Sequence, residues 1–178
     1  MTSPLVARLA LDVDMPALSA LMERAITELL PAFLTPEQVA ASREIMGLDT
    51  QLIEDGTYFV VEIDGALAGC GGWSRRATLF GGDHTGGRDA ALVDPATEPA
   101  RVRAMYTDPG FARRGVGRRI LELCEEGARA EGFRSCQLAA TLAGEPLYAA
   151  CGYRRIEPFE AVASTGVRVP LVRMGKAL

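Results

Sequence analysis

The chain has 178 residues, which suffices for a full hydrophobic core, and we expect residues 1–178 to form one domain. Hydrophobic residues make up 48% of the chain and charged residues 24%, a composition that is typical of a globular protein and excludes a disordered or collagen-like one. The formal net charge of −4 argues against an extended nucleic-acid-binding surface, because neutralising phosphates requires clustered positive charge.

A strand followed by a helix is expected at the N-terminal end. Residues 5–9 predict a short strand, and either Asp12 or Asp14 can then cap a helix that has Pro16 in its first turn. The apolar residues of this helix recur at helical spacing and form one stripe: Leu18, Leu21, Met22, Ala25 and Leu29.

A second helix and a hairpin follow. Thr35 is placed to cap the second helix, and Gly47 is placed to end it. Residues 58–63 and 66–73 are rich in strand-forming residues and are separated by Asp64-Gly65, the strongest short hairpin signal. We therefore expect these two runs to form an antiparallel pair.

The middle of the chain contains a long irregular segment before the next strand. Residues 75–99 are broken by glycines and prolines and lack sustained periodicity, and a loop of this length is usually functional or disordered. Residues 101–107 return to alternation, which predicts a strand with Val102, Ala104 and Tyr106 on one face.

An amphipathic helix is expected to begin near Gly115 or Val116, after a turn at Asp108-Pro109-Gly110 that ends the strand. One face of this helix is apolar: Val116, Ile120, Leu123, Cys124 and Gly127. The opposite face is charged and expected to be in water: Arg118, Arg119, Glu122, Glu125, Glu126 and Arg129.

The C-terminal third predicts a strand over residues 133–140 and a short helix over 144–150. Two final strands are expected over 153–161 and 168–174. About seven strands and about four helices in this order predict an α/β (α+β) fold, in which a mixed sheet is covered by helices.

The cysteine and histidine content argues against a metal site. Cys70, Cys124, Cys136 and Cys151 lie far apart and the chain has a single histidine, His84, so a tetrahedral zinc site is not expected. Each cysteine has apolar neighbours in the sequence, which is typical of a small buried residue. We therefore expect free thiols in a reducing compartment. Because no run approaches about 20 apolar residues and no signal-peptide pattern is found, we expect a cytoplasmic protein without a membrane partner.

Residues 109–118, Pro-Gly-Phe-Ala-Arg-Arg-Gly-Val-Gly-Arg, lie between the expected strand and the amphipathic helix. The first turn of a helix leaves about four N–H groups unpaired and carries partial positive charge, so this junction suits a phosphate group. Gly115 and Gly117 let a ligand approach the backbone. Taken alone, the spacing also fits a helix start with solvated arginines, because it lacks the further residues of a dinucleotide motif or a P-loop.

Here the chain resembles the GNAT superfamily of N-acetyltransferases, whose signature R/Q-x-x-G-x-G/A follows a strand and precedes a helix. Residues 147–153, Leu-Tyr-Ala-Ala-Cys-Gly-Tyr, resemble that superfamily's F-Y-x-x-x-G-F segment, and the hairpin at Asp64-Gly65 resembles its second and third strands. The resemblance covers nearly the whole chain. It implies a mixed, mostly antiparallel sheet that is splayed between the fourth and fifth strands.

Three positions depart from the pattern of the superfamily. Ala112 stands where the signature has Arg or Gln, so we expect the backbone N–H groups of residues 113–118 to bind most of the pyrophosphate. Thr141 stands where many members have an Asn that contacts the pantetheine arm. Arg101 stands where some members carry a glutamate that serves as general base.

The resemblance implies an enzyme that transfers an acyl group, expected to be acetyl, from acyl-CoA to a primary amine by direct attack within a ternary complex, without a metal. The acceptor is expected to be a small molecule or a peptide. Tyr148 is expected near the thioester sulfur as the general acid, since a phenol stays protonated at neutral pH. The residues implied to contact acetyl-CoA are Met105, Tyr106, Thr107, Arg113, Arg114, Gly115, Val116, Gly117, Arg118, Thr141 and Tyr148.

The acceptor amine is expected to bind near residues 75–99, because this segment directly precedes the strand that holds the donor. Glu98 is our first candidate for the general base, acting through water, because Arg101 cannot accept a proton. His84 is the second candidate, since an imidazole ordinarily titrates near neutral pH.

Other interpretations stay open. The departures at Ala112, Thr141 and Arg101 also fit a non-catalytic acyl-CoA sensor or interaction module that keeps the fold. An arginine cluster could instead contact nucleic acid, although the acidic balance disfavours this: Arg113, Arg114, Arg118 and Arg119. We also expect that an edge strand such as residues 168–174 could pair across a homodimer.

Overall fold

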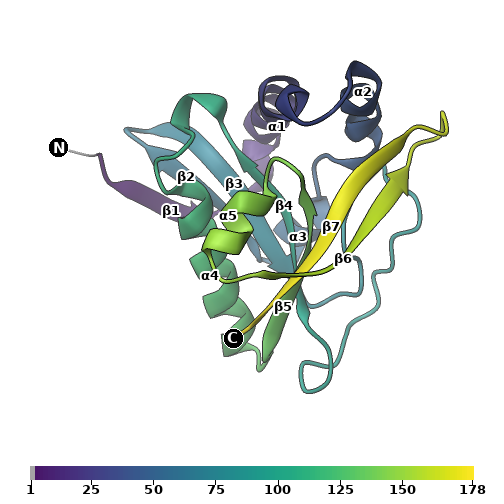
Figure 1. Cartoon of the computed structure of the whole chain (residues 1–178). Coiled ribbons are helices and arrows are strands. Elements are labelled where there is room, and N and C mark those ends of the chain that lie inside the picture. Colours follow the sequence, from purple (N-terminus) through teal and green to yellow (C-terminus); the bar gives the residue numbers. More distant parts are fainter. Residues whose placement is uncertain (1–2) are drawn as a thin grey trace.

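One sheet of seven strands runs through the molecule, and helices cover both of its faces (Figure 1). The structure is a computed structural model and describes residues 3–178. The strand order is β1-β2-β3-β4-β5-β7-β6; β4 and β5 are parallel and the other neighbours antiparallel. The strands are β1 Leu5–Leu9, β2 Tyr58–Ile63, β3 Ala66–Ser74, β4 Ala100–Thr107, β5 Ser135–Thr141, β6 Arg154–Val162 and β7 Arg168–Ala177. The expected mixed, mostly antiparallel sheet is confirmed.

Five α-helices are found in the described residues, one more than the sequence predicted. They are α1 Met15–Leu29, α2 Pro36–Ile45, α3 Thr50–Glu54, α4 Val116–Ala130 and α5 Glu145–Ala150. Short 3-10 turns lie at Asp12–Asp14, Leu30–Ala32 and Pro109–Phe111. The additional helix is α3, which is too short to show a hydrophobic period and has no side-chain cap.

The helices divide into two layers, each with its own part of the core. One layer contains α4 and α5, which lie together in front of the sheet (Figure 1). The apolar stripe of α4 packs against the strands from that side: Val116, Ile120, Leu121, Cys124 and Ala128. On the other face α1 packs against Tyr58, Val60, Cys70 and Tyr106. Further along the sheet α2 lies against β7, and Gln38 Nε2 donates to the Arg168 carbonyl at 3.1 Å.

The capping of α2 follows the sequence. Thr35 Oγ1 accepts a hydrogen bond from the Gln38 N–H at 3.2 Å, and Gln38 Oε1 accepts one from the Thr35 N–H at 3.0 Å. This reciprocal arrangement satisfies two N–H groups at the start of the helix, and Pro36 occupies a position where no N–H is needed. The predicted start of the helix is confirmed.

The sheet opens between β4 and β5. These strands pair only at Ala100 with Cys136 and at Arg101 with Gln137. Beyond these residues the facing edges of the two strands separate, so their N–H and C=O groups are free to pair with something else. The predicted splay between the fourth and fifth strands is confirmed.

A bulge interrupts β4 just after the splay begins. The register against β3 shifts between Gly72, which pairs with Arg103, and Cys70, which pairs with Tyr106. Ala104 has a left-handed φ of 52°, and its carbonyl accepts a hydrogen bond from Tyr58 Oη at 2.8 Å. An extra residue reverses the side-chain alternation, so Val102 faces α4 whereas Tyr106 faces α1. The prediction that Val102, Ala104 and Tyr106 share one face is therefore wrong.

Two further predictions about exposure are wrong. Glu125 was expected in water, but it is 5% exposed, and both its carboxylate oxygens accept from Lys176 Nζ, at 2.9 and 2.8 Å. Residues 168–174 were expected to be a sheet edge, but β7 lies between β5 and β6. Because the edge strands are β1 and β6, a dimer formed by strand pairing would have to use one of these.

Candidate active site

The turn after β4 is held in place by Asp108. Its Oδ1 accepts from the Gly110 N–H at 2.8 Å, and its Oδ2 accepts from Arg24 Nε of α1 at 2.9 Å. The chain then enters α4 through two left-handed residues, Arg113 with φ 62° and Gly115 with φ 83°. These contacts fix the path of the backbone between β4 and α4.

The backbone N–H groups of residues 113–118, which the sequence predicts to bind an anion, lie at the turn into α4 and are called the cradle below. Within residues 3–178 the structure gives these groups no hydrogen-bond acceptor, and the first bond of the helix runs from the Arg119 N–H to the Gly115 carbonyl at 3.0 Å. Unpaired N–H groups at a helix N-terminus attract an anion. The side chains of Arg113, Arg114 and Arg118 are exposed beside this turn.

The two glycines of the cradle serve different purposes. A side chain on Gly115 would extend into open space, with Leu5 Cδ1 at 3.9 Å as its nearest contact. Gly117 is buried, and a Cβ there would lie 2.5 Å from Leu147 Cδ2 of α5. Gly115 thus keeps the cradle open, whereas Gly117 lets α4 and α5 pack closely, which differs from the expectation that both leave room for pyrophosphate.

The segment from Met105 to Thr107 borders the opening in the sheet. Met105 lies on the α4 face, where a Cβ on Gly71 would come within 2.4 Å of its sulfur. Tyr106 lies on the α1 face, and its Oη accepts from the Gly47 N–H at 3.1 Å. In this region β4 pairs with β3 along one edge, and its other edge has no pairing with β5. That second edge can therefore pair with the backbone or the pantetheine amides of a ligand.

Thr141 and Tyr148 close the opposite side of the opening. Thr141 Oγ1 accepts from the Gly144 N–H at 3.0 Å, so the hydroxyl shapes the turn that starts α5. Tyr148 is 8% exposed, its ring packs edge-to-face on Tyr153 with centroids 6.1 Å apart, and burial raises its pKa. The phenol therefore stays protonated at neutral pH.

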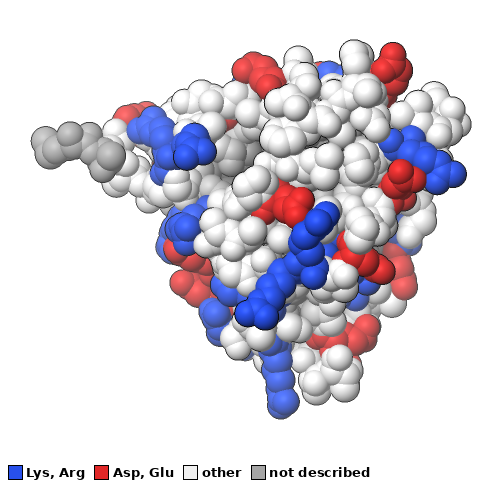
Figure 2. Space-filling view, viewed as in Figure 1, with Lys and Arg blue, Asp and Glu red and all other residues white. Residues whose placement is uncertain are grey.

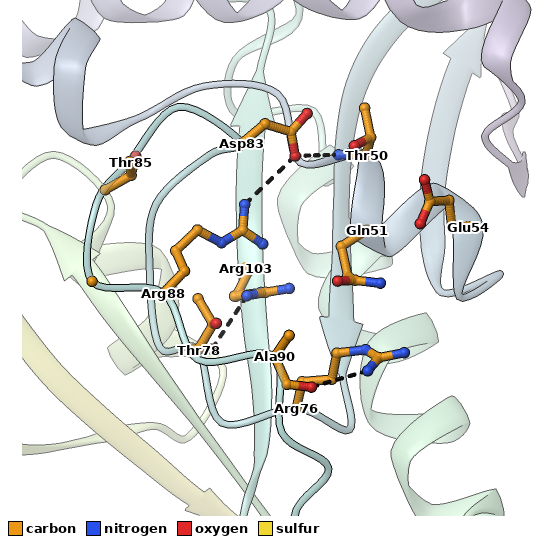
Figure 3. Close-up of a pocket in the computed structure, with 11 residues that line it drawn as sticks. Thr50, Gln51, Glu54, Arg76, Thr78, Asp83, Thr85, Arg88, Ala90 and Arg103 are labelled. Atoms are coloured by element: carbon orange, nitrogen blue, oxygen red, sulfur yellow. Dashed lines mark hydrogen bonds and ion pairs between the residues drawn. The ribbon is translucent and has the colours of Figure 1, made fainter.

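A hollow of about 610 Å³ lies on the α1 side of the sheet, beneath residues 75–99 (Figure 3). Its walls come from α3, from that loop and from β4, and three guanidinium groups reach it. The residues lining it are Thr50, Gln51, Glu54, Arg76, Thr78, Asp83, Thr85, Gly87, Arg88, Ala90 and Arg103. Since pockets of about 300–1,000 Å³ typically hold small molecules, its size suits a small-molecule acceptor.

Residues 22–153 match the sequence model of the Acetyltransferase (GNAT) family. The chain belongs to this family. The match includes β2 to β5, α4, the cradle, the hollow and Tyr148, so the resemblance seen in the sequence is confirmed. No curated protein matches this GNAT chain in sequence.

Solved structures of GNAT proteins share the fold at low sequence identity. A GCN5-related N-acetyltransferase of Rhodopseudomonas palustris has a TM-score of 0.73 at 17% identity, covering 100% of this chain and 98% of the other. A ribosomal-protein-alanine N-acetyltransferase of Brucella melitensis has a TM-score of 0.65 at 18% identity, covering 97% and 99%. The PaiA N-acetyltransferase of Thermoplasma acidophilum, solved in complex with coenzyme A, has a TM-score of 0.66 at 12% identity, covering 98% and 99%.

The structure places the two candidate bases of this GNAT protein differently. Glu98 is exposed before the closed end of β4, and its carboxylate accepts from the Asp94 N–H at 3.3 Å. Glu98 lies before Ala100, the first residue of β4, and about 17 Å of strand separates Ala100 from Met105. Glu98 is therefore not brought close to Met105 at the opening. His84 is nearer: Nε2 donates to the Arg43 carbonyl at 2.9 Å, and its ring packs on Gly47, the residue that donates to Tyr106.

Sequence reasoning missed three charged residues at the hollow: Asp49 and Arg103, which are buried, and Arg88, whose side chain is 17% exposed. Arg103 was the available signal, because it lies between apolar residues of the expected strand and an arginine is rarely buried without a partner. Two further findings concern the described residues, 3–178. No helix there is both long enough and apolar enough to cross a membrane. In the same range, no three His, Cys, Asp or Glu side chains are grouped so that they could hold a metal ion.

Proposed function

We propose that the protein transfers an acetyl group from acetyl-CoA to a primary amine by direct attack within a ternary complex. The observation that carries this proposal is the run of unpaired N–H groups over residues 113–118, directly after a strand that has lost its neighbour. The pyrophosphate of the donor would bind these N–H groups, and its extended pantetheine arm would lie along Met105–Thr107. Both use backbone groups that the fold leaves without partners.

The lining of the opening supports coenzyme A as the donor. At Gly115 the cradle has space that a side chain would enter, and the arginines beside it are exposed. Figure 2 shows basic side chains interleaved with acidic ones on the viewed face, which is unlike the continuous basic surface of a nucleic-acid-binding protein. A single pyrophosphate site fits this distribution better than an extended polyanion does.

The chemistry requires two proton transfers. The amine nitrogen attacks the thioester carbonyl carbon, the carbon–sulfur bond breaks, and the sulfur leaves with its electron pair. We assign Tyr148 as the group that protonates this sulfur, since it is buried beside the opening and its pKa is raised by burial. The amine loses its own proton to a base on the acceptor side, where His84 is better placed than Glu98.

The cysteines are not part of this mechanism. All four are free thiols, and burial raises the pKa of Cys70 and of Cys136 to about 12. A thiol of this kind is a poor nucleophile, because the reactive form is the thiolate. Free buried thiols are also usual in the reducing cytoplasm, where we place the protein.

A turnover screen tests the proposal. Purified protein is incubated with acetyl-CoA and single amines: small amines, amino acids and peptides with free N-termini. Release of free thiol is recorded against hydrolysis without amine. We expect at least one amine to accelerate release and to appear as its acetylated product. Tight binding of acetyl-CoA without accelerated release across the panel would favour a non-catalytic acyl-CoA-binding module.

A further inference from the structure

Two arginines share one buried carboxylate at the floor of the hollow. Asp49 has no exposed surface, and its Oδ1 lies 2.9 Å from Arg88 Nη2 while its Oδ2 lies 3.1 Å from Arg103 Nη2. The side chain of Arg103 is 1% exposed. Figure 3 shows the two guanidinium groups near the centre of the hollow, with the side chain of Gln51 facing them.

Arg103 is the least compensated charge of this cluster. Burial lowers the pKa of Arg103 to about 10, although Asp49 opposes this shift, so the guanidinium is charged at neutral pH yet poorly compensated. Within residues 3–178, Arg103 Nε and Nη2 find no acceptor in hydrogen-bonding geometry, and Nη1 has only the Thr78 carbonyl at 3.4 Å. Buried donors without acceptors are costly, which favours an additional anion here.

The other carboxylates at or near the hollow do not contact Arg103. Both carboxylate oxygens of Asp55 accept hydrogen bonds from Arg76, from Nε at 2.8 Å and from Nη2 at 2.9 Å. Asp83 lies at the rim with a side chain that is 42% exposed, and its Oδ1 is 3.5 Å from Arg88 Nη1. Glu54 is the remaining carboxylate on the wall. Arg88 therefore has two carboxylate partners, Asp49 and Asp83, whereas Arg103 has Asp49 alone and keeps its Nε without an acceptor among the described residues.

The position of the cluster relates it to the donor. The bulge at Ala104 puts Arg103 and Tyr106 on the same face of β4, the face that carries the hollow. Arg103 lies two residues before Met105, which is about 7 Å along a strand. A molecule held by its anionic end at Arg103 can thus extend toward Met105–Thr107, the segment along which we place the extended arm of the donor.

We propose that the hollow binds the carboxylate of the acceptor, so that the acceptor is an amino acid or another small amino-carboxylic compound. This inference rests on the proposed acetyl transfer. The paired guanidinium groups of Arg88 and Arg103 bind the carboxylate, because arginine matches its planar two-oxygen geometry. Because Asp83 and Glu54 also line the hollow, a carboxylate with one negative charge meets less repulsion there than a phosphate dianion.

The test compares amino acids with their amides, which keep the amine and lose the charge. Glycine, L-alanine and L-lysine are each assayed beside glycinamide, L-alaninamide and L-lysinamide for thiol release from acetyl-CoA. We expect at least one acid to exceed its amide by about tenfold or more in kcat/KM. In Arg88→Met the preference should fall to within about twofold, mainly through a higher KM for the acid.

Arg75→Met is the matched control. Arg75 belongs to the same loop but donates from Nε to Glu131 at 2.8 Å and does not line the hollow. We expect this variant to keep the preference for the acid. Arg88→Met leaves Asp49 paired with Arg103, and circular dichroism and thermal unfolding are recorded for both variants to show that they fold.

A binding measurement separates this inference from the proposed function. Each acid and amide is titrated calorimetrically into the protein without acetyl-CoA. Binding of an acid that is lost in Arg88→Met and kept in Arg75→Met supports the carboxylate site, even in the absence of thiol release. Equal turnover of acids and amides, or a preference that persists in Arg88→Met, overturns it while leaving acetyl transfer intact. Absence of both binding and preference for all three pairs also overturns it.

Discussion

Gly115 and Gly117 lie within one turn of the chain, but the absence of a side chain has a different structural effect at each position. Gly115 takes a left-handed backbone conformation and leaves open space beside the unpaired N–H groups. Gly117 is helical and buried, and its missing side chain is replaced by Leu147 of the neighbouring helix. Substitutions at these two positions should therefore fail for different reasons.

We expect Gly115→Glu to weaken acetyl-CoA binding by about tenfold or more, because the carboxylate enters the cradle and repels the pyrophosphate. The control is Gly132→Glu at the other end of α4. Gly132 has a similar φ of 90°, and an added Cβ meets no atom of the described chain within 4 Å, so both variants carry the same backbone strain. Calorimetric titration with acetyl-CoA measures the difference. Equal affinities in the two variants would show that Gly115 is not part of the donor site.

Tyr148→Phe removes the proposed acid and keeps the buried ring. We expect kcat to fall by about 10² to 10⁴ while the KM for acetyl-CoA changes little, because proton donation acts in the transition state. The matched control is Tyr153→Phe, which also removes a buried hydroxyl and keeps a ring that packs on Tyr148, so we expect kcat to change little. Undiminished kcat in Tyr148→Phe, measured where chemistry limits the rate, would leave the tyrosine a packing role only.

At the residue scale, the sequence revealed the parts of the site that are contiguous in the chain. The helix start after residues 113–115 and the short helix that carries Tyr148 could be predicted because helix starts and short motifs are local features, whereas the roles of these residues stay predictions. The cluster of Asp49, Arg88 and Arg103 could not, because it joins a turn, a loop and a strand that are far apart in sequence. No local pattern specifies such a pairing.

At the scale of elements, α4 positions α5 and with it Tyr148. We expect Gly117→Ala to destabilise the protein by about 1–3 kcal/mol and to lower kcat, because its Cβ would lie 2.5 Å from Leu147 Cδ2 and displace α5. Adding Leu147→Ala makes room for that methyl group. Urea unfolding should show the double variant to be more stable than the sum of the single changes by over about 0.5 kcal/mol. Strict additivity would contradict direct packing between the two positions.

Long elements were predictable, whereas interruptions within them were not. The amphipathic stripes of α1 and α4 and the Asp64-Gly65 hairpin follow from periodicity and turn chemistry. The bulge at Ala104 contains no glycine that would have predicted it from the sequence. It nevertheless changes which face of the sheet each later side chain of β4 points to. The face that carries Arg103 and Tyr106 therefore became evident only in the structure.

At the scale of the whole molecule, contacts distant in sequence decide which surfaces are exposed. The insertion of β7 between β5 and β6 brings Lys176 beneath α4, where it pairs with Glu125. A charged residue on the polar side of a helical pattern is normally solvated, so the sequence suggested the opposite. Strand order depends on pairing between residues far apart in sequence, so it cannot be predicted from the helical period of α4.

The loop over the hollow is tied to the rest of the fold by a second ion pair. Arg76 joins Asp55 at the end of α3 and also donates from Nη1 to the Ala90 carbonyl at 2.9 Å, linking both arms of the loop to the helix. The side chain of Asp55 is 9% exposed. The hydrogen bonds from Arg76 lower its pKa in the folded protein, although burial opposes the shift.

Acid should therefore weaken the protein partly through Asp55. A carboxylate whose folded pKa is depressed stabilises the fold fully above its unfolded pKa of about 3.9, and the contribution is lost as the pH falls through the folded value. We expect Asp55→Asn to lower the free energy of unfolding by about 1–3 kcal/mol at pH 7 and by progressively less below about pH 4. The exposed Asp12 provides the control variant Asp12→Asn, for which we expect little change at any pH. Urea unfolding from pH 7 down to about 2.5 measures both, and a deficit in Asp55→Asn that stays constant over this range would rule out titration of Asp55 as its cause.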